Sequence, residues 1–316
     1  MKKILVLIVF IFSVAGSIFA ANPAEDFEYS LNDDFTSVDI TKLKNNKDTY
    51  IIPKSIDGMP VRRVFLGNFK GFRNVSNVTI TLSDSISFFH YSKTDDVFFC
   101  PVTIDGLSDN LVDFFIFAEK QNPWDISQLH VPETNSITVK GSIDKLKSLE
   151  RVVLENVNLE NTTVICRKTW KLYSFFNTNI KDLSFEEGIG RVEETYEGKV
   201  FDKTKAEYVW QNLTRVVVES HIEGRMGINL FNRDGADRQI WGFAYNSKLT
   251  KVTIPKDVYS IGHDTFFNCS QLSEIIFPED AGNIFRGDWQ SKTFKGTAFP
   301  MKAQALIRQK GYQGEF

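Results

Sequence analysis

The sequence predicts a solenoid of stacked short repeats, with short parallel strands along one face and irregular or short helical segments along the other. The main evidence is an internal repeat between residues 241 and 278. Leu249 recurs as Leu272 and Phe243 recurs as Phe266, and both pairs are 23 positions apart. A unit this short cannot bury its own apolar face, so neighbouring copies must share one continuous core.

Each clear copy contains a strand that is followed by a stop signal. Val252 and Ile254 lie two positions apart, which is the period of a strand with one buried face. Pro255 follows directly, and it ends the strand because proline donates no backbone hydrogen bond. Ile261 and Phe266 come next and are expected to fill the volume behind the strand.

A complete motif, L-x-x-V-x-I-P-x-x-V-x-x-I-G-x-x-x-F-x-x-C, runs from Leu249 to Cys269. It resembles the BspA-type (treponemal) leucine-rich repeat. The resemblance implies an interaction scaffold of the kind found in secreted and surface proteins, several of them adhesins, and implies no catalytic chemistry. Cys269 occupies the small buried position of the motif, and Asn246 takes the same position one copy earlier.

Residues 1–20 have the pattern of a secretory signal peptide. Two lysines precede an apolar run from Ile4 to about Val14, and small residues lead to Ala20. The run is shorter than the roughly 20 residues that a membrane-spanning helix needs, although an uncleaved anchor is an alternative. We therefore expect an exported chain that is secreted or on the outer surface, with the periplasm as the alternative location.

The remaining chain is expected to form a cap, a repeat array and a second cap. Residues 21–72 contain the sequence I-P-x-x-I-x-G-x-P-V, which resembles the opening repeat of the BspA-type family. Residues 73–290 form the array with its inserts, and residues 291–316 form the C-terminal cap, with a short helix over 301–310. Caps are needed because the end coils of a solenoid would otherwise expose the core.

The middle of the array is degenerate but keeps strand spacing in a series of apolar triplets. These are Val75/Val78/Ile80, Leu111/Phe114/Ile116, Ile126/Leu129/Val131, Leu149/Val152/Leu154, Ile180/Leu183/Phe185 and Leu213/Val216/Val218. Three polar segments, 88–100, 193–208 and 223–238, are interpreted as inserts that project as loops from one face. Such loops either carry function or are tolerated decoration, because surface insertions cost little free energy.

Composition and motifs argue against several classes of function. The chain has 37 basic and 40 acidic residues, so its charge points to neither nucleic acid nor an anionic membrane. Three cysteines make a set that is too sparse and odd for a disulfide framework. The four histidines are scattered, and the sequence holds no metal-binding or nucleophile motif. We expect no enzymatic activity, no cofactor and no metal.

The candidate binding surface is the row of strand residues that point away from the core. If Val252 and Ile254 point inward, alternation turns Thr253 outward, and the same position can be read in other repeats. The resulting candidate protein-binding residues are Phe115, His130, Val153, Val217, Thr253 and Ile276. Large apolar side chains in an exposed row indicate a protein contact. The alternatives are that β-branched residues merely favour strands, or that an insert covers them.

Two functions remain open at this point. The first is a secreted or cell-surface module that binds a protein ligand, such as a host matrix protein or a bacterial surface protein, in an adhesion role. The second is a periplasmic scaffold protein of the cell envelope. A hydrolase built on the repeats is a distant third.

Overall fold

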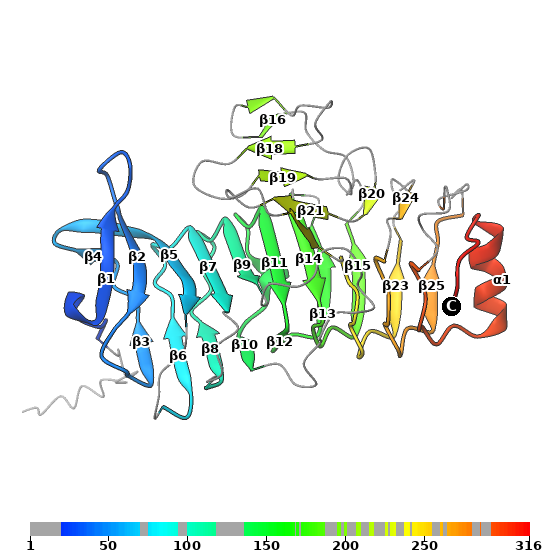
Figure 1. Ribbon diagram of the computed structural model, residues 1–316, viewed down its shortest axis with the longest axis horizontal. Coiled ribbons are helices and arrows are strands. Elements are labelled where there is room, and N and C mark those ends of the chain that lie inside the picture. The colour runs from blue at the N-terminus through cyan, green and yellow to red at the C-terminus, as the bar shows by residue number, and fades with distance from the viewer. Residues whose placement is uncertain are drawn as a thin grey trace, which may run out of the picture.

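The computed structural model describes an elongated solenoid, with its N-terminal cap and its C-terminal helix at opposite ends of the long axis (Figure 1). The described residues are 20–69, 75–93, 100–117, 136–167, 169–170, 172–186, 242–254, 260–261, 264–279, 285 and 292–316, together with short strands between 195 and 240. The repeat solenoid predicted from the sequence is therefore confirmed.

One wall of the solenoid is a sheet, called sheet 1, to which successive coils each add a strand. Its order is β1 (Phe27–Leu31), β2 (Val38–Leu43), β5 (Met59–Phe69), β7 (Phe88–Lys93), β9 (Asp113–Phe117), β11 (Arg151–Glu155) and β14 (Leu172–Phe176). Pairing is parallel except between β1 and β2, and β4 (Ser55–Ile56) pairs antiparallel with β5. Parallel pairing follows because each coil returns to the same wall in the same direction.

The other wall consists of two parallel sheets. Sheet 2 has the order β12 (Val157–Leu159), β10 (Ile137–Val139), β8 (Val102–Asp105), β6 (Val78–Thr81) and β3 (Thr49–Ile51). Sheet 3 has the order β13 (Thr163–Cys166), β15 (Asp182–Phe185), β23 (Lys251–Thr253) and β25 (Glu274–Ile276). The chain alternates between the walls, as the strand numbering in Figure 1 shows.

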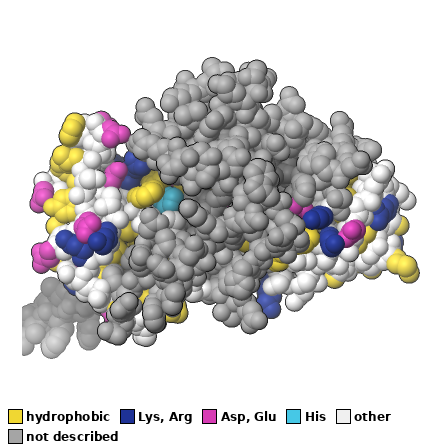
Figure 2. Space-filling model, in the orientation of Figure 1, with side chains coloured by type: hydrophobic (Ala, Val, Ile, Leu, Met, Phe, Trp, Pro, Cys, Tyr) yellow, Lys and Arg dark blue, Asp and Glu magenta, His cyan; other side chains and the backbone are white. Residues whose placement is uncertain are grey.

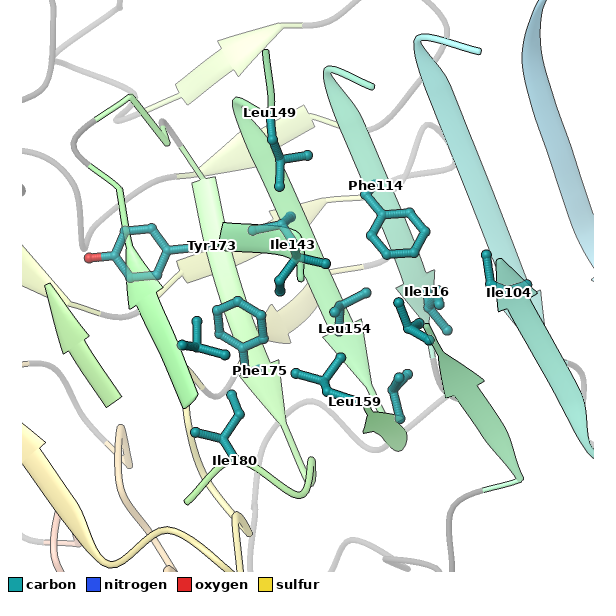
Figure 3. Packing of buried hydrophobic residues seen from close by; sticks show 14 of the residues in the cluster. Ile104, Phe114, Ile116, Ile143, Leu149, Leu154, Leu159, Tyr173, Phe175 and Ile180 are labelled. Atoms are coloured by element: carbon teal, nitrogen blue, oxygen red, sulfur yellow. The ribbon is translucent and has the colours of Figure 1, made fainter. Parts of the chain in front are cut away.

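The hydrophobic core lies between the walls. Phe114 and Ile116 on β9 and Leu154 on β11 point inward from sheet 1, and Ile104 on β8 comes from sheet 2 (Figure 3). Ile143, in the short 3-10 helix η3 (Ile143–Lys145), packs among them. All five side chains are buried, so successive coils share one continuous core, as the repeat length requires.

The apolar triplets belong to two walls and not to one. The triplets at 111–116 and 149–154 place their strands in sheet 1, whereas those at 75–80 and 180–185 place theirs in sheets 2 and 3. Among the described residues, the prediction of strands on one face and irregular chain on the other holds for 242–254 and 264–279, but not between 38 and 176, where both walls are strands. The strands of both walls bury one face against the core, so their sequences show the same alternation of apolar and polar residues.

In the C-terminal coils, turns replace the strands of sheet 1 but keep its hydrogen-bonded ladder. The N–H of Phe175 donates to the carbonyl of Gly242 at 2.8 Å, and the N–H of Phe243 donates to the carbonyl of Thr265 at 2.9 Å. In the next coil, the N–H of Phe266 donates to the carbonyl of Thr293 at 3.1 Å. The rings of Phe175, Phe243 and Phe266 stack at centroid distances of 6.0 and 5.6 Å, so the aromatic position of the repeat fills the core behind sheet 3.

The position shared by Asn246 and Cys269 is buried in both copies, as the sequence predicts. Asn246 Nδ2 donates to the carbonyls of Phe175 and Phe243, both at 2.5 Å, and its Oδ1 accepts the N–H of Thr178 at 2.8 Å. Cys269 Sγ donates to the same Phe243 carbonyl at 3.2 Å. One small polar side chain per coil therefore satisfies backbone groups that the turns leave without a strand partner.

Asn246→Cys, which copies the residue of the next coil, is expected to lower the free energy of unfolding by about 2 kcal/mol. The thiol can still reach a carbonyl, but the buried N–H of Thr178 and the carbonyl of Phe175 lose their partner. Chemical denaturation measures the change, with Cys269→Ala as the milder control. An unchanged midpoint would mean that the bonds of Asn246 contribute nothing to stability.

The predicted insert at 88–100 is wrong in its first half. Residues 88–93 form β7, and Phe89 is fully buried in the core. The other two predicted inserts fall in a region outside the main walls. Its described strands are β16 (Thr195–Tyr196), β17 (Lys199–Val200), β18 (Glu207–Val209), β19 (Arg215–Val217), β20 (Arg225–Met226), β21 (Ile228–Phe231) and β22 (Asp237–Ile240). The strands β18, β19, β21 and β22 form an antiparallel sheet, and β20 pairs with β24 (Ser260–Ile261).

Each end of the core carries a capping element. At the N-terminus, a 3-10 turn, η1 (Ala24–Asp26), precedes β1, and Asn22 pairs with Ile51 at the edge of sheet 2 through bonds of 3.0 and 2.6 Å. At the C-terminus, the predicted helix is present as α1 (Met301–Gln309), and Ile307 on it is fully buried. In the part of the chain that the structure describes, no helix has the length and hydropathy of a membrane span.

Candidate protein-binding surface

The six predicted binding residues do not form one row. Thr253 and Ile276 lie on sheet 3, whereas Phe115 and Val153 lie on sheet 1. His130 lies outside the described residues, and Val217 belongs to β19 in the separate antiparallel sheet, where only the backbone is described. The prediction joined these positions because it treated all triplets as strands of one sheet.

Phe115 and Val153 were predicted to be exposed, and this is wrong. They alternate with core residues and so lie on the outer face of sheet 1, yet they are only 1% and 0% exposed. The ring of Phe115 packs edge-on against Phe88 at 6.0 Å, and the guanidinium of Arg151 forms a buried ion pair with Asp113 beside them. The outer face of sheet 1 is thus packed around these two residues, and neither side chain is exposed.

The outer face of sheet 3 is accessible. Val164, Leu183, Val252 and Ile275 point inward and are buried. The side chains between them point outward and define the sheet 3 outer face. These are Thr163, Ile165, Asp182, Ser184, Lys251, Thr253, Glu274 and Ile276. Each of these eight side chains is exposed or half-buried, so the surface is open across all four strands.

The face consists of a charged row beside a mixed apolar row. Asp182 aligns with Lys251, which aligns with Glu274, and Lys251 Nζ lies 2.9 Å from Glu274 Oε1. Both partners of this ion pair are largely in solvent, so it adds little stability and can exchange partners on binding. In the second row, Ile165 and Ile276 stand at the two edges and are each 40% exposed.

Ile165 was not found from the sequence. Residues 163–166 read TVIC and lack the leucine spacing that marks the other strands. The sequence indicates this strand only weakly, through three consecutive β-branched residues that precede the small residue Cys166. Cys166 is fully buried, which fixes the alternation and turns Ile165 outward.

A scan against protein families finds that residues 241–299 match the family described as "BspA type Leucine rich repeat region (6 copies)". Residues 241–299 are a BspA-type leucine-rich repeat region. These repeats contribute β23 and β25 to the sheet 3 outer face, including Thr253 and Ile276. No curated protein matches the chain.

Two solved structures resemble this chain at low sequence identity. The leucine-rich repeat protein of T. pallidum is 15% identical, with 94% of this chain and 99% of that chain covered and a TM-score of 0.37. A leucine-rich cell-surface protein of Faecalibacterium prausnitzii A2-165 is 16% identical, with coverage of 82% and 76% and a TM-score of 0.23.

The described residues bring together no group of three His, Cys, Asp or Glu side chains that could hold a metal ion. All three cysteines are free thiols. Burial raises the pKa of the Cys269 thiol in the BspA-type repeats to about 12, and burial also raises the pKa of Cys166. Both thiols are therefore protonated at neutral pH, and they act as small core residues and not as nucleophiles.

Proposed function

We propose that this chain is an exported binding module that presents the sheet 3 outer face to a protein ligand. The observation that carries the proposal is the pair of exposed isoleucines, Ile165 and Ile276, at the two edges of a rigid four-stranded face. Three strand spacings of about 4.8 Å separate them, which gives roughly 14 Å between the two apolar contacts. The BspA-type match supports an interaction role, and the predicted signal peptide supports export.

The chemistry of the face favours a protein over a charged polymer. Aliphatic contacts next to a charged rim are the usual composition of a protein interface. Asp182, Lys251 and Glu274 carry both signs and run alongside the apolar row, so they can fix the register of a partner without attracting polyanions. A ligand segment with two apolar side chains about 14 Å apart would contact both isoleucines at once.

Ile276→Asp is expected to weaken ligand binding about tenfold or more, because a charge replaces an apolar contact at the interface. The melting temperature should stay close to that of the wild type, since the side chain is 40% exposed. Residues 21–316 would be titrated over immobilised matrix proteins such as fibronectin, laminin and collagen. Ile165→Asp should produce the same loss from the opposite edge of the face.

Thr49→Asp is the matched control for binding, because it adds the same charge at an exposed strand position on sheet 2. It should bind like the wild type. Saturable binding that survives in both isoleucine variants would contradict the assignment of the site to sheet 3.

The location of the chain needs a separate test. Labelling of intact cells with a membrane-impermeant reagent should modify the protein if it lies on the outer surface. Protection in intact cells, with labelling only after the outer membrane is opened, would place the chain in the periplasm. The ligand would then be sought among envelope proteins.

A further inference from the structure

The N-terminal end of the solenoid leaves apolar side chains uncovered. β1 is the end strand of sheet 1 among the described residues, and its residues Tyr29 and Leu31 pair with the core residues Ile40 and Val38 of β2. Both β1 side chains are nevertheless exposed, because the described chain places no further coil beside them. The apolar side of sheet 1 therefore continues to the very end of the solenoid.

The turn after β1 displays a third apolar side chain in a fixed position. Phe35 is 71% exposed and has a φ of 58°, a conformation that bulky residues rarely adopt. Asn32 Oδ1 accepts the N–H groups of Thr36 and Ser37 at 2.9 and 3.0 Å, and Asp34 Oδ1 accepts the hydroxyl of Thr36 at 2.6 Å. The hydrogen-bonded turn holds Phe35 outward, so little conformational entropy remains to be lost on binding.

The opposite end of the solenoid also presents apolar side chains. Ile307 anchors α1 in the core, while Met301 and Leu306, which lie on different flanks of the same helix, are exposed, Met301 by 85%. The guanidinium of Arg308 lies 4.8 Å from the ring centre of Phe316, which fixes the last turn of the helix against the cap. This end is thus a rigid helical surface with two uncovered apolar side chains.

The two ends carry opposite charge. Residues 20–37 contain five acidic and no basic residues, and Asp33 and Asp34 lie directly beside Phe35. Residues 292–316 contain five basic residues and one acidic residue. Ion pairs with Lys47 and Lys42 offset two of the N-terminal acids, Asp26 and Glu28, and over residues 20–63 eight acidic residues stand against six basic ones, so the N-terminal end keeps a small negative excess. Figure 2 shows hydrophobic, acidic and basic side chains intermixed at the N-terminal end.

We propose that the partner of each end is the opposite end of a second copy of this chain. The Phe35 turn and β1 of one copy would pack against α1 of the next, with Phe35 and Leu31 facing Met301 and Leu306 across complementary charges. Because the ends lie at opposite extremes of the long axis, one copy cannot join its own two ends, and the head-to-tail contact links successive copies into a chain (Figure 1). The sheet 3 outer face is not used in this contact, so the inference does not depend on the proposed ligand.

Sedimentation velocity of residues 21–316 at low salt tests the inference. The weight-average mass should rise about twofold or more as the protein concentration rises. It should fall again at high salt, because screening weakens exposed charge pairs. Phe35→Gly removes the apolar contact while it relieves the positive φ, so this variant should stay folded and be monomeric. Met301→Asp should also be monomeric, whereas Ile165→Asp, in the middle of the solenoid, should assemble like the wild type.

Mixing the two end variants distinguishes head-to-tail contact from contact between like ends. Phe35→Gly retains an intact C-terminal end and Met301→Asp retains an intact N-terminal end, so an equimolar mixture should form dimers and nothing larger. Assembly of Met301→Asp on its own would mean that two N-terminal ends associate, which would overturn the proposal. A wild-type chain that stays monomeric at every concentration at low salt would overturn it as well.

Discussion

Ile254→Asp is expected to lower the free energy of unfolding by about 4 to 5 kcal/mol, the largest loss predicted for this chain. Ile254 follows β23 directly, its N–H donates to the carbonyl of Ile276 at 2.8 Å, and its side chain is buried in the core. A carboxylate at this position would lose both its hydration and the packing of the isoleucine, because the described residues of the surrounding core are apolar. Equilibrium denaturation in urea measures the loss.

Ile276→Asp provides the matched control. It makes the same chemical change on β25, the strand that neighbours β23, but the Ile276 side chain points outward and is exposed. It should change the free energy of unfolding by less than about 0.5 kcal/mol. Equal destabilisation by the two variants would mean that the register of sheet 3 is wrong. A wild-type-like Ile254→Asp would have the same consequence.

The C-terminal coils could be predicted from the sequence because their period is intact. Leu249 and Leu272 mark equivalent turns, Val252 pairs with Ile275, and the aromatic position fills the core behind them. The terminal helix was also predictable, since Met301 follows a proline and Gly311, with a φ of 96°, stands at the stop position. Local spacing determines these elements, so the sequence carries the information directly.

The division of the strands between two walls could not be predicted in the same way. Alternation reports that one side of a strand is buried, but it does not report which wall the strand joins. Val78 on β6 and Phe114 on β9 are both buried and have the same spacing, yet β6 belongs to sheet 2 and β9 to sheet 1. Only the tertiary pairing of β6 with β8 and of β9 with β11 separates them.

Part of the candidate site was predictable because it lies in the repeats whose period is intact. Thr253 and Ile276 belong to the intact repeats, and their outward direction follows from the burial of Val252 and Ile275. Phe115 has an identical pattern but lies on sheet 1, where it packs against Phe88 and is buried. The sequence cannot distinguish an outward residue that meets solvent from one that neighbouring side chains bury.

A substitution in the buried ion pair of sheet 1 tests whether the outer face of this sheet is packed. Arg151 Nε and Nη2 donate to the two carboxylate oxygens of Asp113, and both residues are buried. Arg151→Met is expected to lower the free energy of unfolding by about 3 to 5 kcal/mol, because it removes the guanidinium that pairs with both oxygens of the buried Asp113 carboxylate. A pair exposed to solvent would lose only about 1 kcal/mol or less, so denaturation in urea separates the two cases.

The double variant Asp113→Leu, Arg151→Met shows whether the loss comes from the stranded charge or from lost packing. Replacement of a buried ion pair by apolar residues of similar volume is often neutral or stabilising, so the double variant should recover most of the stability that Arg151→Met loses. A loss below about 1 kcal/mol in the single variant would mean that solvent reaches this face. Phe115 and Val153, which flank the pair on β9 and β11, would then return to the accessible surface and could contribute to ligand binding.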